Sequence, residues 1–428
     1  MTLTAVKGFR DALPVAARIL SRVERAAVGV LDRYGYAEVR VPILERTEVF
    51  ARSLGETTDI VEKEMYTFED RDGTLVTLRP EGTAPVVRAF VEHHLDQQDS
   101  VARLYYLGPM FRRERPQKGR HRQFYQIGVE LFGRDDALAD AEVIALLRDI
   151  LAEIGIDSAR IRLNSLGDQT CRPAYREKLR AFGEAHRDEL CPSCRNRLER
   201  NPLRILDCKE PGCRAATKDA PMLLDHLCAP CADHFARLRT LLDDLGIVYE
   251  LDHRLVRGLD YYVRTAFEVV AAGLGAQEAV GGGGRYDGLV AQLGGPATSA
   301  IGFALGVDRL VLALEAADPL TAARAEADLR PQVFIAPLGT DAEREALRLA
   351  GRLRGLDVRV EIDGGRSLKS LMRRADKRGA ARVLIIGEEE VAARRATVRD
   401  MGAKLDKKLA VGFDLDGPAL LEAVGVRR

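Results

Sequence analysis

The chain has 428 residues, enough for two or three domains of ordinary size, and 46% of them are hydrophobic. Lys and Arg total 65, as do Asp and Glu, so net charge neither indicates nor excludes a nucleic-acid partner. No apolar run approaches the roughly 18 residues of a membrane span, and the first residues contain no apolar segment typical of a secretory signal. Seven cysteines in so long a chain exclude a secreted disulfide scaffold. These features predict a cytoplasmic protein without a membrane segment.

Residues 1–325 predict an α+β domain with a mostly antiparallel sheet. Apolar residues recur every three or four positions from Pro14 to about Tyr34, which indicates a long amphipathic helix. Residues 36–41 then alternate as a strand that Pro42 closes. Further strands are expected at residues 65–68, 75–78, 104–110 and 124–132, and their short connections favour antiparallel pairing. A helical pattern follows to about Ile154.

A helical, cysteine-bearing segment of about residues 171–245 is expected to be an insertion in this domain. Strand patterns return at residues 248–251, 261–270 and 300–304. After an alanine-rich connection, strands at 333–337, 358–362 and 383–386 alternate with helices at 342–353 and 368–377. This alternation predicts a second, α/β domain at residues 331–428 with a mostly parallel or mixed sheet.

The segment FRRERPQKGRHRQFYQIGVELF, residues 111–132, is the strongest functional motif. Six cationic side chains fall within eleven residues, against the single acid Glu114. Arginine offers a planar fork of donors that matches phosphate oxygens, and Phe124 stands where a strand resumes, available to stack on a purine. The alternative is a solvated, charged hairpin, but the order strand, arginine, loop, Arg-x-Phe, strand favours a phosphate site.

Two shorter motifs have residue types suited to a small polar ligand. Glu81 follows a strand and could accept a cationic amino group, with Thr83 as a hydroxyl partner, although a turn glutamate is usually solvated. Arg257 precedes a glycine in LVRGLDYYVRTAFEV, and Tyr261 and Tyr262 would point to opposite faces if they lie in a strand. One arginine and one tyrosine hydroxyl would suit a carboxylate ligand, whereas adjacent tyrosines are more often one core ring and one surface ring.

Glycines mark the last motif of the first domain. Four consecutive residues, Gly281–Gly284, exclude an ordinary strand interior and favour backbone packed against a ligand or another chain. Neither the dinucleotide fingerprint nor the Walker A spacing is met. The spacing Gly302-x3-Gly306-x2-Arg309 places an arginine at the start of a helix after a strand, which is a geometry suited to phosphate.

Cysteines and a basic helix complete the set. Two CxxC pairs about thirty residues apart fit a tetrahedral structural zinc site formed by Cys191, Cys194, Cys228 and Cys231, and the alternative is small buried thiols. The expected helix at 368–377 has cationic side chains around an apolar stripe, which is either a surface that follows a phosphate backbone or a solvated face.

The order of these motifs resembles that of the second-class aminoacyl-tRNA synthetases, and RGLDYY together with GTAP narrows the resemblance to the histidyl-tRNA synthetases. The helix, strand and Pro42 resemble the family's dimer-interface motif, residues 111–130 its second motif, and Gly302 to Arg309 its third. The resemblance covers essentially the whole chain. It implies a ligase that activates L-histidine with ATP and Mg²⁺ and transfers it to tRNA(His), a homodimer, and a C-terminal anticodon-binding domain.

The resemblance also implies a role for each matching residue. For ATP, Arg112 would hold the α-phosphate, Phe124 would stack on adenine and Arg309 would hold the far phosphates. Arg257 would lie beside the α-phosphate and the histidine carboxylate, and Arg115 and Gln117 would approach the tRNA acceptor end. The residues that would bind histidine are Glu81, Thr83 and Gln126 at its main-chain groups, Glu130 and Tyr262 at the imidazole nitrogens, and Tyr261 and Tyr286 along the pocket.

Two other functions fit parts of the pattern. A regulatory subunit similar to a synthetase would bind histidine without charging tRNA, but such proteins typically lack the C-terminal domain and part of the arginine and RGLDYY set, which are intact in this chain. A second-class synthetase for another amino acid would share the phosphate motifs and differ in the pocket.

Overall fold

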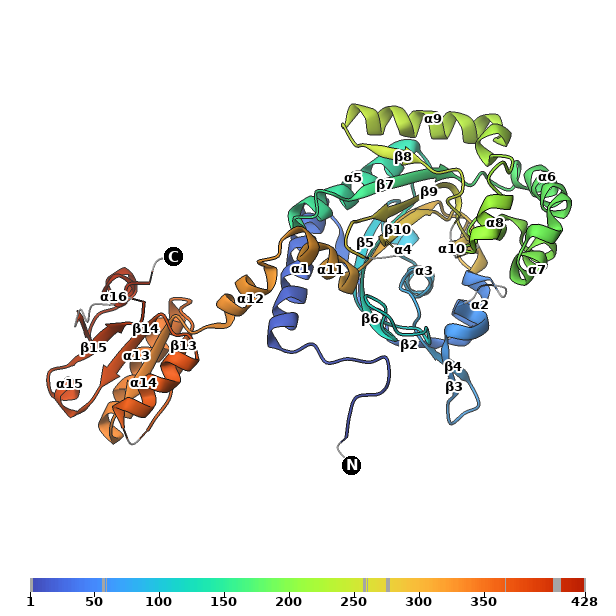
Figure 1. Ribbon diagram of the computed structural model, residues 1–428. Helices are drawn as coiled ribbons and strands as arrows, with labels where there is room; N and C mark the ends of the chain where they lie inside the picture. Colours follow the sequence, from blue (N-terminus) through green and yellow to red (C-terminus); the bar gives the residue numbers. More distant parts are fainter. Residues whose placement is uncertain are drawn as a thin grey trace. The chain divides into compact units, whose positions relative to one another are not determined.

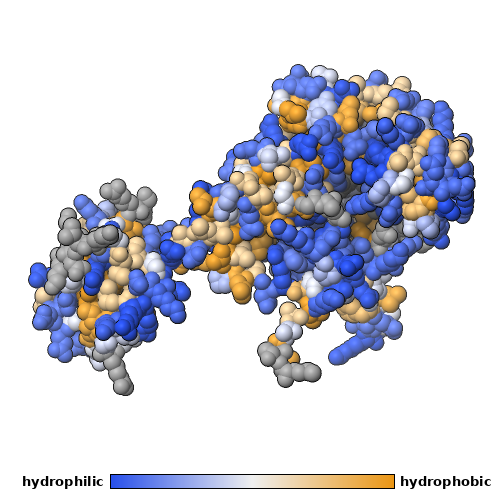
Figure 2. Space-filling view, in the orientation of Figure 1, coloured by the Kyte–Doolittle hydropathy of each residue, from blue (hydrophilic) through white to orange (hydrophobic). Residues whose placement is uncertain are grey.

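The computed structural model describes residues 3–55, 58, 60–256, 259, 261–274, 278–365, 367–402 and 409–426. The chain divides into two compact units, Met1–Thr321 and Ala322–Arg428. Exposed large hydrophobic side chains are scattered along the sequence, and Figure 2 shows hydrophobic areas interspersed among hydrophilic ones. Among the described residues, no helix has the length and apolar character needed to cross a membrane.

An eight-stranded sheet forms the centre of the first unit (Figure 1). Its pairings are antiparallel except β1 with β5 and β7 with β8, which confirms the mostly antiparallel sheet predicted from the sequence. In spatial order the strands are β1 (Ala37–Glu38), β5 (Ala102–Phe111), β6 (Gln123–Phe132), β11 (Ala300–Gly306), β10 (Ala279–Arg285), β9 (Val263–Val270), β7 (Arg160–Ser165) and β8 (Tyr249–Leu251).

The strands expected at 65–68 and 75–78 do not join this sheet. They form a separate three-stranded sheet in the order β2 (Leu44–Arg46), β4 (Leu75–Leu78) and β3 (Tyr66–Glu69). Between β4 and β5 lie α3 (Thr83–Glu92) and α4 (Leu95–Gln98), which the sequence patterns did not indicate. Most of α3 is buried, including Val86 and Val87 at adjacent positions, so its sequence lacks the one-sided periodicity that predicts a helix.

The first unit has further helices outside the insertion. The predicted long helix is present as α1, and Gly35 follows it with a φ of 72°. Asp136 caps α5 by accepting a hydrogen bond from the Ala139 N–H at 3.0 Å. The helices are α1 (Pro14–Arg33), α2 (Thr47–Leu54), α5 (Ala137–Ile154), α10 (Leu289–Gln292) and α11 (Val307–Ala317), and α12 (Thr321–Leu329) follows at the boundary between the units, with a π-helical turn at Ile60–Glu64.

The predicted helical insertion lies between β7 and β8. Its helices are α6 (Arg172–Ala185), α7 (Pro192–Arg200), α8 (Pro211–Ala216) and α9 (Ala229–Asp244), with short 3₁₀ turns at Arg187–Glu189, Pro202–Ile205 and Leu223–His226. In Figure 1, α6, α7 and α8 cluster together at one end of the sheet.

The second unit has the predicted α/β architecture with a mixed sheet. The strand order is β13 (Val360–Ile362), β12 (Val333–Pro337), β14 (Arg382–Ile386), β15 (Arg395–Asp400) and β16 (Leu409–Gly412), with the first three parallel and the last two antiparallel. Separate apolar clusters on α13 (Thr340–Gly355) and α14 (Leu368–Lys377) cover the sheet, and α15 (Glu388–Ala392) and α16 (Gly417–Val424) complete the unit.

Helix α14 has the basic surface expected from its sequence. Leu371 and Ala375 are buried, whereas Lys369, Arg373 and Lys377 are exposed. Two other cations at this helix form ion pairs: Arg374 with Asp363 at 2.6 Å, and Arg378 with Glu361.

Candidate active site

A cavity of about 220 Å³ opens on one face of the large sheet. Its floor consists of residues with small side chains or none, among them Gly281, Gly282, Ala304 and Gly306 on the adjacent strands β10 and β11. The run Gly281–Gly284 therefore lies inside a central strand, which corrects the expectation drawn from four consecutive glycines. Position 283 requires glycine, because β11 packs so closely that a Cβ on Gly283 would lie 2.0 Å from the carbonyl oxygen of Gly302.

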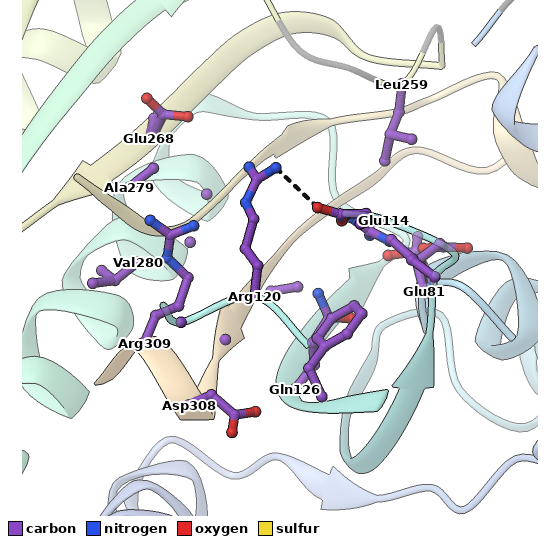
Figure 3. Close-up of a pocket in the computed structure, with 18 of the residues that line it drawn as sticks. Glu81, Glu114, Arg120, Gln126, Leu259, Glu268, Ala279, Val280, Asp308 and Arg309 are labelled. Carbon is purple, nitrogen blue, oxygen red and sulfur yellow. Dashed lines mark hydrogen bonds and ion pairs between the residues drawn. The ribbon is translucent and has the colours of Figure 1, made fainter. Parts of the chain in front are cut away.

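Arginines gather at one side of this cavity. The Nε of Arg112 donates to the Pro80 carbonyl at 2.8 Å, and its guanidinium lies 5.2 Å from the centre of the Phe124 ring. Arg120 and Arg309 project into the same space from the loop and from the start of α11 (Figure 3). Burial, together with the charge of Arg120, lowers the pKa of Arg309. Three arginines around one buried space favour an anionic ligand with several charges.

The arginine-rich loop is held by the N-terminal segment. Arg112 N–H donates to the Arg122 carbonyl at 2.9 Å, which closes the loop, and Arg122 N–H donates to the Gly8 carbonyl at 2.8 Å. The predicted residues Arg115 and Gln117 are exposed on this loop and do not line the cavity. Their exposure leaves them accessible to a macromolecule that approaches the cavity.

Another part of the cavity wall, which begins next to Arg112, has uncharged polar groups and one carboxylate. Glu81, Thr83, Gln126, Tyr261 and Tyr262 all line it, as the sequence analysis grouped them. Glu81 is 5% exposed and accepts hydrogen bonds from the N–H groups of Thr83 and Ala84, each at 2.8 Å. The side-chain oxygen of Gln126 is buried and has no hydrogen-bond partner within the described part of the chain. A buried acceptor without a partner is costly, so the site is suited to a ligand that donates to it.

The two tyrosines are arranged differently from the prediction. Strand β9 begins at Val263, so Tyr261 and Tyr262 precede it and do not point to opposite faces of a strand. Both rings are buried, their centres are 4.6 Å apart, and both line the cavity. The alternative, in which one tyrosine ring lies in the core and the other on the surface, is therefore wrong for this pair.

Glu130 and Tyr286 lie directly behind the cavity wall. Glu130 is fully buried; its Oε1 accepts from the Thr83 hydroxyl at 2.7 Å, and its Oε2 accepts from the Tyr286 hydroxyl. A Cβ on Gly302 would lie 2.2 Å from the same carboxylate, so only glycine fits opposite Glu130 on β11. Of the predicted site residues, Arg257 falls outside the described residues.

The pKa of Glu130 is raised to about 8. Burial is the main cause and the nearby Glu81 adds to it, whereas the hydrogen bonds from Tyr286 and Thr83 act in the opposite direction. The carboxyl group is therefore protonated at neutral pH in the free protein. A protonated carboxyl can donate to an unprotonated imidazole nitrogen, and an ionised one can pair with an imidazolium.

We expect the free protein to lose more thermal stability between about pH 4.5 and pH 8 than its Glu130→Gln variant. The folded pKa of about 8 lies above the ordinary value of 4.5, so the folded chain retains a proton that the unfolded chain releases. The stability that this proton provides is present at low pH and is lost as the pH rises through the folded pKa. Thermal melts of both proteins across this range measure it, and parallel curves would contradict the assignment.

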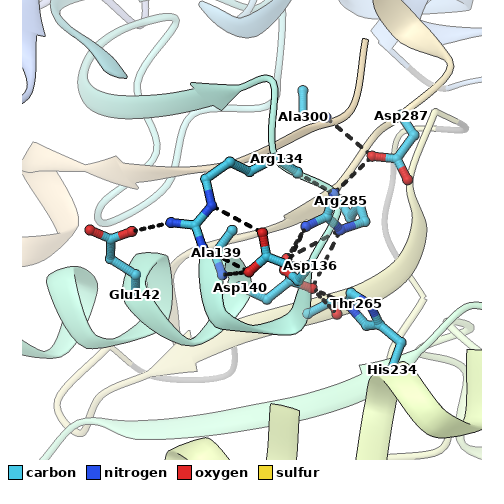
Figure 4. Close-up of polar contacts among 10 residues, drawn as sticks. All are labelled: Arg134, Asp136, Ala139, Asp140, Glu142, His234, Thr265, Arg285, Asp287 and Ala300. Atoms are coloured by element: carbon cyan, nitrogen blue, oxygen red, sulfur yellow. Dashed lines mark hydrogen bonds and ion pairs between the residues drawn. The ribbon is translucent and has the colours of Figure 1, made fainter. Parts of the chain in front are cut away.

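A buried polar network fixes the end of β10 beside Tyr286 (Figure 4). Arg285 and Asp140 are both fully buried and form an ion pair, and His234 Nε2 lies 2.8 Å from Asp140 Oδ2. Burial raises the pKa of Asp140, but the hydrogen bond to His234 and the charge of Arg285 outweigh it, so the pKa is lowered. Asp287 accepts from Arg285 at 3.0 Å and from the Ala300 N–H at 3.1 Å. The network therefore holds β10 and the start of β11 in a fixed relation.

Three acidic residues of the cavity were not predicted as site residues. Glu114 accepts from Arg120 at 2.9 Å, and Asp308 accepts from the Tyr125 N–H at 3.0 Å and pairs with Arg10. Glu268 lies on β9 opposite Gly282, on the same side of the cavity as Arg309 in Figure 3. In the sequence, Glu268 is the single acidic residue of the strand segment RTAFEV. Its position indicates a cavity residue only once the structure shows that it faces a glycine.

The predicted quartet of cysteines is wrong. The structure places the two CxxC pairs in different clusters: Cys191 and Cys194 lie with Cys208 and Cys213, whereas Cys228 and Cys231 lie with Cys171 and Asp168. Each pair lies at the start of a separate helix, α7 or α9, and meets a different second pair of side chains. The spacing of cysteines along the chain could not show which pairs lie together, because a CxxC pair can form a four-ligand site with any second pair that the fold brings near.

Comparisons with known proteins agree with this architecture. The family model described as histidyl-tRNA synthetase matches residues 8–310, and the model described as anticodon binding domain matches residues 332–414. A histidine–tRNA ligase of Geobacter metallireducens is 54% identical over 93% of this chain and 95% of the relative, and one of Syntrophotalea carbinolica is 52% identical over 94% of each. The solved apo histidyl-tRNA synthetase of S. aureus is 34% identical, with a TM-score of 0.77 over 96% of this chain and 98% of that chain. The chain belongs to the histidyl-tRNA synthetase family, which confirms the resemblance carried by its motifs.

Proposed function

We propose that the protein activates L-histidine with ATP to form histidyl-adenylate and pyrophosphate, and then transfers histidine to the 3′ end of tRNA(His). The observation that carries this proposal is one cavity lined by three arginines and, next to Arg112, by a polar side that includes Glu81 and Gln126. This lining suits a nucleotide and an amino acid that react with each other. Family membership supports the same reaction.

The reaction needs no nucleophile from the protein. The histidine carboxylate attacks the α-phosphorus of ATP, the bond to the β-phosphate oxygen breaks, and pyrophosphate leaves. The protein's part is to position the two substrates and to stabilise the negative charge that develops. In this arrangement Arg112 binds the α-phosphate, Phe124 stacks on adenine and Arg309 binds the far phosphates. Arg257 falls outside the described residues, and its proposed role at the α-phosphate and the histidine carboxylate rests on the family resemblance.

Mg²⁺ fits this site because it prefers oxygen ligands and substrate phosphates. The carboxylates of Glu268 and Glu114 line the cavity beside the arginines and would hold it. When bound, the ion neutralises charge on the phosphates.

Histidine occupies the polar side in this proposal. Glu81, Thr83 and Gln126 bind its main-chain groups, with Glu81 accepting from the ammonium group. Tyr262 and Glu130 read the two imidazole nitrogens, with Tyr261 and Tyr286 along the pocket. Because Glu130 bonds to Thr83 and Tyr286, the imidazole must take over one of these hydroxyl contacts. Recognition through buried polar groups rejects similar ligands far better than apolar fit does.

The proposed tRNA contacts lie on exposed basic and polar groups. Arg115 and Gln117 approach the acceptor end, and the exposed cations Lys369, Arg373 and Lys377 of α14 suit a phosphate backbone. We propose residues 331–428 as the anticodon-binding domain and residues 1–325 as the catalytic domain with its insertion, in a cytoplasmic protein.

A homodimer is proposed through the α1, β1 and Pro42 region. The short strand β1 lies at the edge of the large sheet, and Ile43 and Leu44 just after it are 43% and 40% exposed. Apolar side chains exposed beside a sheet edge suit burial against a second copy. A solution mass of two 47.2 kDa chains is the expected result.

ATP–pyrophosphate exchange with each of the twenty amino acids tests the function. Exchange with histidine alone, together with charging of tRNA(His), is the expected result. Histidine binding without exchange would favour a regulatory subunit, and exchange with another amino acid would favour a synthetase of different specificity.

Removing residues from Arg330 onward should lower tRNA charging much more than histidine-dependent exchange. The cavity residues all belong to the first unit, whereas the basic helix α14 belongs to the second. Loss of cationic phosphate contacts weakens tRNA binding without altering the activation site. Both assays on the truncated and full-length proteins measure the effect, and equal losses would count against an anticodon-binding role for this unit.

A further inference from the structure

All seven cysteines of the chain fall in two compact clusters outside the active-site cavity. We propose that each cluster binds one structural zinc ion. The insertion site consists of Cys191, Cys194, Cys208 and Cys213, and the junction site consists of Asp168, Cys171, Cys228 and Cys231. In each site the four ligand atoms lie within 4.8 Å of one another.

The geometry of the insertion site fits tetrahedral coordination. A zinc–sulfur bond of about 2.3 Å places tetrahedral sulfurs about 3.8 Å apart, and the sulfurs of Cys191 and Cys208 are 4.0 Å apart. A disulfide would require about 2.05 Å. The Cys191 N–H donates to the sulfur of Cys213 at 3.0 Å, the kind of backbone hydrogen bond that stabilises a thiolate ligand.

Burial favours a closed, structural site. Cys194 and Cys213 are 0% and 1% exposed, and four protein ligands leave no open position for a substrate. Thiols packed only as small apolar groups would have no reason to converge on one point. Cys191 also immediately precedes α7, where the helix N-terminus favours the charged thiolate over the thiol.

The junction site joins the beginning and the end of the insertion. Asp168 and Cys171 lie between β7 and α6, whereas Cys228 immediately precedes α9 and Cys231 lies in its first turn. The Asp168 carboxylate Oδ1 is 3.5 Å from the sulfur of Cys171 and 3.7 Å from that of Cys228. Asp168 N–H donates to the sulfur of Cys171 at 3.2 Å, and a carboxylate oxygen is an established zinc ligand type.

The short helices of the insertion need contacts beyond their own hydrogen bonds to be stable, and a bound zinc ion would supply them. Helix α8 has six residues and α7 has nine, which is below the length of about 12–15 residues at which isolated helices become stable in water. A zinc ion ligated from both helices and the intervening loop would fix them together. At the junction site, Arg172 follows Cys171 and donates to the carbonyl oxygens of Leu166 and Tyr262. The junction site therefore lies one residue from a contact that fixes a ligand-binding tyrosine.

Metal content measures the proposal directly and does not depend on ligase activity. Full-length protein purified without chelator should contain two zinc ions per chain by elemental analysis. Cys194→Ser should lose the ion of the insertion site and Cys231→Ser that of the junction site, leaving one ion in each variant. Ser193→Ala, which changes a residue between two ligands, is the matched control and should retain two ions.

A second measurement covers variants that fail to fold. In the wild-type protein, titration with an organomercurial thiol reagent should release two zinc ions, and a strong chelator should lower the melting temperature and raise thiol reactivity. Less than about 0.2 zinc per chain, iron with visible absorption, or disulfides among these cysteines by mass spectrometry would overturn both sites. One zinc ion, lost only in Cys194→Ser, would overturn the junction site.

Discussion

Replacing Glu130 with glutamine should lower kcat/KM for histidine in ATP–pyrophosphate exchange about 100-fold, with little change in the KM for ATP. Glutamine has nearly the same shape, but it can neither carry charge nor exchange a proton with an imidazole. Loss of a charge-assisted hydrogen bond costs up to about 3 kcal/mol, and each 1.4 kcal/mol is about tenfold. Because Glu130 is fully buried, water cannot replace the missing contact.

The control for this change is Glu92→Gln, which removes a carboxylate that is 59% exposed and paired with Arg88 on the outside of α3. It should leave exchange kinetics unchanged. A loss under about threefold in Glu130→Gln, or an equal loss of ATP affinity, would contradict a role in reading the imidazole. Tyr262→Phe should show the same selective effect on histidine, since its hydroxyl would serve the other ring nitrogen.

Replacing Arg112 with alanine should slow adenylate formation about 100- to 1,000-fold, the usual scale for losing one preorganised electrostatic group. The Pro80 carbonyl and the Phe124 ring hold this guanidinium in place before substrate binds, so little reorganisation is needed when charge develops. Arg112→Lys keeps the charge but loses the planar fork, and it should give an intermediate rate. Single-turnover formation of histidyl-adenylate measures both variants.

Arg71→Ala is the matched control, because Arg71 is exposed at the turn between β3 and β4 and does not line the cavity. It should form adenylate at the wild-type rate. A fall under about threefold in Arg112→Ala would remove this residue from the proposed transition-state contacts. A fall confined to the KM for ATP would assign it to ground-state binding.

The sequence was sufficient for features that depend on local order. The amphipathic period of α1 and the alternation of strands and helices after residue 331 predicted these elements, and the strand-like segments of β5 and β6 were also expected. Arg309 was expected at the start of a helix after a strand, and the structure places it in the first turn of α11 after β11. The order of the arginine and glycine motifs, together with RGLDYY and GTAP, was also enough to identify the family.

Features that depend on contacts between distant segments required the tertiary structure. Helix α3 was missed because it is buried on most sides. The three-stranded sheet was not separated from the large one, because the sequence pattern of a strand does not indicate which strand pairs with it. Glu268 became a cavity residue only through its glycine neighbour on β10. The cysteine pairs show the same limit: their spacing indicated metal ligands, but only the fold decided that α7 and α9 begin in different places and that Asp168 completes a cluster. Residue types and local periodicity are properties of the sequence, whereas which segments meet is decided by packing.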